Sequence, residues 1–105
     1  MSQAAKSEIT IYLKDNVEVP LTLSSKTAIQ QSMLKHYYAT NPEAVGEPEI
    51  LITECNLSDD NIEIELYSTR KKNLDFQVDL LQDFLNGDEF ADIIEEVIED
   101  TWVQI

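Results

Sequence analysis

Apolar and polar residues alternate in several short segments of this 105-residue chain, and this pattern constrains the fold more than any other feature. Between Ile9 and Leu13 every second residue is apolar, and segments 17–23 and 61–68 repeat the pattern. Successive side chains of a β-strand point to opposite faces, so each segment matches a half-buried strand. The sequence therefore predicts an antiparallel sheet that buries one face.

The first two strands are expected to form a hairpin over residues 8–23. A three-residue loop at 14–16 would place Leu13 opposite Val17, and Asn16 tolerates the left-handed conformation that such a loop requires. Pro20 cannot donate a ladder hydrogen bond, so the second strand is expected at a sheet edge or with a bulge.

A second hairpin is expected over residues 50–68, with its turn at Ser58–Asn61. This register pairs Leu57 with Ile62 and Cys55 with Ile64, all four pointing toward the core. Glu63 and Glu65 then point outward.

Residues 24–42 are expected to form the first helix. Thr27 and Gln30 have the spacing of a capping box, and Ile29, Met33 and Tyr37 recur at four-residue intervals on one face. That face is expected to pack on the sheet.

Residues 74–80 fit two structures. Apolar residues alternate strictly from Leu74 to Leu80, which favours a strand, with 69–73 as its hairpin loop. Leu74, Val78, Leu81 and Leu85 also fit one face of a helix, which Asn86–Gly87 would end. We favour the strand and retain the helix as the alternative.

The end of the chain is expected to be the second helix, capped by Asp88, with an apolar stripe at Phe90, Ile93, Ile94 and Val97. The expected order is ββαβββα. It describes a single α+β domain over residues 1–105, an antiparallel sheet with two packed helices, in which residues 1–7 are frayed.

The composition limits the classes of function. A formal net charge of −14 repels nucleic acids and anionic membranes, and attracts basic protein surfaces. Two glycines leave little material for phosphate-binding loops. One cysteine, with no signal-like or membrane-spanning segment, indicates a cytoplasmic protein.

The charge is concentrated in one part of the chain. Residues 1–72 contain eleven acids and all seven bases, whereas residues 73–105 contain ten acids and no base. On the expected last helix, neighbouring acids would form six repulsive pairs that cost roughly 1–3 kcal/mol in total. Acids placed at such a cost indicate either a solvated face or a binding face. The candidate binding residues there are Asp92, Glu95, Glu96 and Glu99.

A second candidate row consists of Asp75, Asp79 and Asp83, which would lie about 6 Å apart along a helix. In charge pattern the chain resembles DNA-mimicking inhibitors of restriction enzymes, CRISPR effectors and repair enzymes. This resemblance implies an inhibitor that offers carboxylates to the basic cleft of a nuclease or other nucleic-acid-binding effector. The alternatives are an immunity protein that neutralises a basic nuclease toxin, anchored by Trp102, or a non-catalytic assembly partner.

No catalytic, metal or cofactor site is expected. His36 and Cys55 lie on different elements and lack an orienting third group. The acids from Asp59 to Glu65 lack the glycine and the terminal glutamate of a calcium-binding loop. We therefore expect a protein that works by binding.

Overall fold

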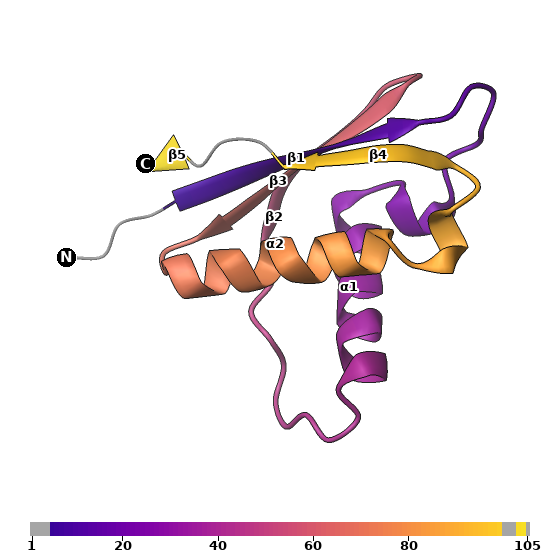
Figure 1. Cartoon of the computed structure of the whole chain (residues 1–105). Helices are drawn as coiled ribbons and strands as arrows, with labels where there is room; N and C mark the ends of the chain where they lie inside the picture. The colour runs from indigo at the N-terminus through magenta and orange to yellow at the C-terminus, as the bar shows by residue number, and fades with distance from the viewer. Residues whose placement is uncertain (1–4, 100–102, 105) are drawn as a thin grey trace.

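The computed structural model describes residues 5–99 and 103–104, and the side chains of residues 5–98 within them. Figure 1 shows the chain. Its elements are β1 (Ala5–Leu13), the 3₁₀ turn η1 (Leu21–Leu23), α1 (Lys26–Thr40), β2 (Ile52–Leu57), β3 (Asn61–Ser68), α2 (Lys71–Leu85), the 3₁₀ turn η2 (Asp88–Phe90), β4 (Ile94–Glu99) and β5 (Val103–Gln104).

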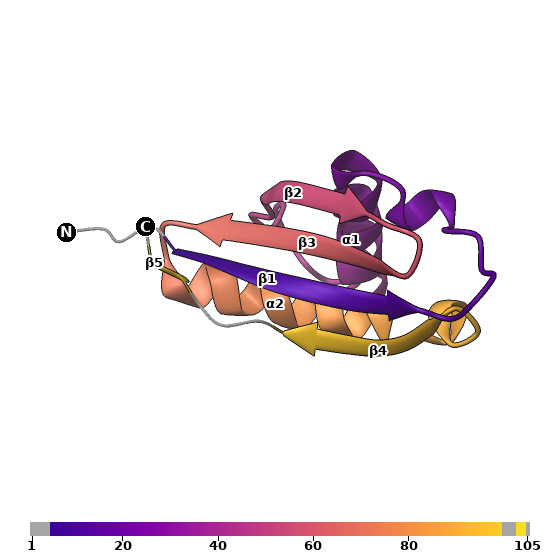
Figure 2. The same ribbon diagram turned by 90° about the horizontal axis from the view of Figure 1, so that it is seen from above.

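The strands form one antiparallel sheet in the order β2-β3-β1-β4, and β5 pairs with β1 beyond β4. β3 lies between β1 and β2, which is the split β-α-β arrangement. Viewed from above, both helices lie behind the sheet, so only one of its faces is covered (Figure 2). The expected α+β class, an antiparallel sheet with two helices, is confirmed.

The core lies between the sheet and the two helices. In β1 and β3, buried residues alternate with partly exposed ones, as expected for strands with one covered face. Gln77 is the one buried amide side chain among the described residues. The largest fully buried apolar side chains are Ile9, Ile11, Leu23, Ile29, Met33, Ile62, Ile64, Leu66, Leu74, Leu81 and Phe90.

Helix α1 confirms the expected core face, since Ile29 and Met33 are buried and Tyr37 packs against the core. Its cap differs from the expected capping box. The side chain of Ser25 accepts a hydrogen bond from the Ala28 N–H at 3.1 Å. Ser25 therefore fulfils the capping role that Thr27 was expected to have.

The β2–β3 hairpin has the expected register, with Leu57 opposite Ile62 and Cys55 opposite Ile64. Cys55 is half-buried against the core. Leu57 was expected to point into the core, but it is 44% exposed because the hairpin end extends beyond the helices.

Two expectations near the N-terminus are wrong. Residues 5–7 are part of β1, with Ala5 and Ser7 buried, and are not frayed, whereas residues 1–4 lie outside the described residues. Residues 17–23 form a loop and η1 instead of a second strand. Both sides of β1 are already paired, with β3 and with β4, so no edge remains for them. Asn16 does adopt the left-handed conformation (φ 62°).

The favoured strand at 74–80 is also wrong, because these residues belong to α2. The alternative helix face is confirmed: Leu74, Val78, Leu81 and Leu85 are all buried. Val78 is the only β-branched residue between positions 71 and 85, so the composition suits a helix better than a strand. The basic segment 70–72 begins this helix and is not a hairpin loop.

The expected last helix is also wrong. η2 occupies residues 88–90, and β4 then pairs with β1. Four of the seven residues from Ile93 to Glu99 are β-branched, which favours a strand. A strand also separates the acids that a helix would have crowded together, and it occupies the second side of β1. The order is therefore βαββαβ, followed by the short β5.

Candidate interaction surface

Most charged side chains on the uncovered face of the sheet are glutamates. Residues of β1 and β3 that alternate with the core residues point to this face. The same holds for Glu54 and Glu96 on the two outer strands, by their register with Glu65 and Tyr12. The acids on this face are Glu8, Glu54, Glu63, Glu65 and Glu96.

Three of these glutamates form a row across neighbouring strands. Glu65 of β3 lies directly opposite Glu8 of β1 on one side. On its other side it lies directly opposite Glu54 of β2. Directly opposed residues have Cβ atoms about 4.5–5.5 Å apart, and like charges in such positions are destabilising. We call Glu8, Glu54 and Glu65 the glutamate row.

Two side chains contact the central glutamate of the row. Lys6 Nζ lies 3.3 Å from Glu65 Oε2, and Thr53 Oγ1 donates a hydrogen bond to Glu65 Oε1 at 2.8 Å. The central glutamate is therefore held in place, with a side chain that is 19% exposed. Lys6 is the only basic residue within the described strands, so the face remains negative.

Two exposed apolar side chains share this face with the acids. Tyr12 lies opposite Glu96, and Ile98 lies opposite Thr10, so the two apolar side chains are diagonal neighbours on β1 and β4. Each is 37% exposed. An apolar spot beside charges is typical of protein–protein contact surfaces.

A second acidic surface runs along α2. Asp75, Asp79 and Asp83 are all exposed, and each lies one turn from the next, so the helical row described as the alternative is present. Asp83 is not free, because its Oδ2 lies 2.6 Å from His36 Nε2 on α1. We call these three residues the α2 stripe.

The four candidate acids near the C-terminus do not form a row. Asp92 lies in the turn before β4, and Glu95 lies where the pairing with β1 shifts register. Glu96 points to the open face. Glu99 pairs with Ile9 in the backbone register, and its side chain lies outside the described part of the structure. Trp102 also lies outside the described residues.

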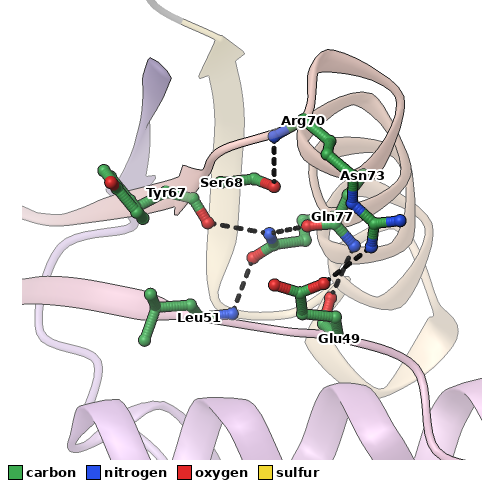
Figure 3. Close-up of polar contacts among 7 residues, drawn as sticks. All are labelled: Glu49, Leu51, Tyr67, Ser68, Arg70, Asn73 and Gln77. Carbon is green, nitrogen blue, oxygen red and sulfur yellow. Dashed lines mark hydrogen bonds and ion pairs between the residues drawn. The ribbon is translucent and has the colours of Figure 1, made fainter. Parts of the chain in front are cut away.

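Sequence reasoning missed the polar cluster that fixes α2 to the sheet (Figure 3). The buried amide of Gln77 accepts a hydrogen bond from the Leu51 N–H at 2.8 Å. It donates to the Tyr67 carbonyl at 3.0 Å and to Asn73 Oδ1 at 2.7 Å. A polar residue on the apolar face of a helix was the available signal. The side-chain oxygen of Gln77 and both of its side-chain N–H groups have partners within the protein, so the cluster serves the fold.

The basic residues at the start of α2 belong to the same region. Arg70 Nη2 lies 2.7 Å from Glu49 Oε2, and the Arg70 N–H donates to Ser68 Oγ at 3.0 Å. Asn73 Nδ2 donates to the Glu49 carbonyl at 2.9 Å. These contacts join the loop before β2 to the helix, as Figure 3 shows.

His36 and Cys55 have different surroundings in the described part of the chain. His36 contacts Asp83, not Cys55, and burial raises the pKa of the Cys55 thiol, which disfavours the nucleophilic thiolate. Among the described residues no three His, Cys, Asp or Glu side chains converge as metal ligands. Neither α1 nor α2, nor any other described helix, combines the length and apolar character that a membrane span requires.

Comparison with known proteins adds no family to this description. No protein-family model matches the chain, and no curated protein and no solved structure matches it either. The function must therefore be inferred from the residues and their geometry.

Proposed function

We propose that this protein is a non-catalytic inhibitor that presents its open, acidic sheet face to the basic cleft of a nucleic-acid-handling protein. The glutamate row supports this proposal most directly. Its three carboxylates are held on adjacent strands with one lysine nearby, although like charges in opposed positions destabilise the free protein. A cationic partner would relieve this repulsion.

The proposed partner is a protein that normally binds a phosphate backbone. Such a protein offers a groove lined by Arg and Lys, and a fixed array of carboxylates can pair with those side chains as phosphates do. Nucleic acid itself is repelled by a net charge of −14. We place the activity in the cytoplasm, which fits a free cysteine and the nuclease class of partner.

The second candidate function is that of an immunity protein against a basic nuclease toxin. The observation that favours it is the apolar pair Tyr12 and Ile98 on the open face, which can serve as a contact anchor. Salt separates the two functions. Binding through many charge pairs weakens steeply as salt rises, whereas binding anchored by apolar side chains weakens little.

The test is capture of partners from a lysate of the native host by the tagged full chain, at low and at high salt. Each captured protein is identified, purified and assayed for its affinity for the chain and for displacement of labelled double-stranded DNA. We expect a nucleic-acid-binding protein that high salt releases and that binds either DNA or this chain, not both.

A pair of triple variants locates the surface. Glu8→Gln with Glu54→Gln and Glu65→Gln neutralises the glutamate row, whereas Asp75→Asn with Asp79→Asn and Asp83→Asn neutralises the α2 stripe by the same amount of charge. Circular dichroism establishes that both are folded. We expect the first variant to lose about 100-fold in affinity, at roughly 1 kcal/mol for each lost charge pair, and the second to lose little. Equal losses would show that net charge acts without a defined face.

A further inference from the structure

The two outer strands of the sheet differ in how open they are to a further strand. β2 is closed. Helix α1 packs against it, and Lys26 Nζ donates a hydrogen bond to the Thr53 carbonyl at 3.4 Å. The extra residue at Thr53 also interrupts the register with β3. A bulge and a lysine are two features that prevent an edge strand from pairing further.

β4 has neither a bulge nor a lysine contact over most of its length. Among the described residues it pairs with β1 alone, and residues 96–99 lie in regular register with residues 9–12. The register shift is confined to its first residues.

The main-chain groups of Val97 point away from the sheet. Lys14 N–H donates to the Ile93 carbonyl at 2.9 Å, so even-numbered residues of β1 direct their main-chain groups toward β4. In an antiparallel pair such residues bond to those directly opposite, here Glu96 and Ile98. The N–H and carbonyl of Val97, between them, face the open side.

The side chains along this edge indicate what an added strand would carry. Val97 and Ile94 lie partly buried against the core, so an added strand would place apolar side chains beside them. Glu96 lies exposed on the open face, where basic side chains would meet it. A second copy of this chain, also at −14, is disfavoured by charge.

We propose that β4 binds an extended segment of the partner protein by β-strand addition, and that this segment alternates basic with apolar residues. The sign of its charge rests on the proposed function, whereas the mode of binding rests on the open edge of β4. Main-chain hydrogen bonds would supply affinity, and the alternating side chains would supply specificity.

The test uses three synthetic peptides with the alternating sequence Arg-Val-Arg-Val-Arg-Val-Arg and the full-length protein. One is unmodified, one is N-methylated at each of the three valines, and one is N-methylated at each of the three arginines that follow a valine. A peptide residue opposite Val97 shares its face and directs its N–H to β4, so the valine N–H groups are the ones that bond. The arginine-methylated peptide is the matched control, with the same charge and the same number of methyl groups.

Fluorescence anisotropy at low salt measures binding, and hydrogen exchange measures protection of the Val97 amide. We expect methylation at valine to weaken binding about tenfold or more, because several main-chain hydrogen bonds are lost, and methylation at arginine to weaken it much less. The Val97 amide should exchange more slowly with the unmodified peptide.

A pair of proline variants tests the same point from the side of the protein. Val97→Pro removes the outward N–H of β4, and Cys55→Pro makes the equivalent change on β2, where Cys55 also faces away from its partner strand. We expect only Val97→Pro to weaken binding of the unmodified peptide. Thermal melts establish that both variants are folded. Equal binding of all three peptides would overturn strand addition and leave the proposed acidic surface standing. Absence of any binding would overturn strand addition, and the lysate capture would then decide the proposed function separately.

Discussion

The glutamate row and the α2 stripe carry the same chemical group on different backbones. On α2, each aspartate lies about 6 Å along the axis from the next, and the residues between them point elsewhere. In the glutamate row, the acids come from three strands and directly oppose one another. The helix spreads its charge along a line, whereas the sheet concentrates it across a surface.

The two surfaces also differ in how their charge is compensated. The α2 stripe loses one carboxylate to His36, which links the two helices. In the glutamate row, Lys6 contacts the central member, Glu65. We assign the binding function to the sheet face because its acids oppose one another across three strands and share that face with Tyr12 and Ile98.

The largest expected effect comes from removing the link between helix and sheet. Gln77→Leu leaves the Leu51 N–H and the Tyr67 carbonyl without their partner, so we expect a loss of roughly 1–3 kcal/mol in the free energy of unfolding. Chemical denaturation measures it, with the exposed Gln31→Leu as the control. The start of β2 and the glutamate row should loosen, so the Leu51 amide should exchange faster. The α2 stripe should remain helical. An unchanged stability would mean that apolar packing alone holds α2.

A smaller effect distinguishes the two acidic surfaces directly. Glu54→Lys replaces a repulsive contact with Glu65 by an attractive one, and should stabilise the free protein by a few tenths to about 1 kcal/mol. Asp79→Lys likewise replaces repulsion of Asp75 and Asp83 by attraction, and should stabilise the free protein by about 0.4–1 kcal/mol. Thermal melts measure both gains.

The partner affinity of these two variants should differ although their stabilities are similar. Only Glu54→Lys should weaken binding of the captured partner, because it places a positive charge within the row. A loss of affinity in Asp79→Lys alone would transfer the binding function from the sheet face to α2.

The smallest expected effect concerns the contact between the helices. A double-mutant cycle of His36→Gln and Asp83→Asn should give a coupling free energy of about 0.2–1 kcal/mol, since the Asp83 carboxylate is largely exposed. The same cycle with Asp79→Asn, one turn away, should give none. A coupling at both aspartates would indicate a general charge effect and would remove the distinction between Asp83 and the rest of the stripe.

Some features of this protein follow from the sequence alone. The alternation in residues 8–13 and 61–68 identifies β1 and β3 as strands, because it places the isoleucines of each segment on one face. The four-residue spacing of Ile29, Met33 and Tyr37 identifies the buried face of α1. The excess of acids, from which we expect repulsion of nucleic acid, needs no coordinates.

The tertiary structure decided the second half of the chain. The apolar residues of segment 71–85 fit both the alternation of a strand and one face of a helix. The segment is a helix because the face that it buries as a helix completes the core beneath β1 and β3. Segment 94–99 is a strand because β1 had a free side, which a strand rich in β-branched residues can fill. The candidate site shows the same limit. The expected β2–β3 register already places Glu54 opposite Glu65. Glu8 joins them only through the pairing of β1 with β3, which no local pattern records.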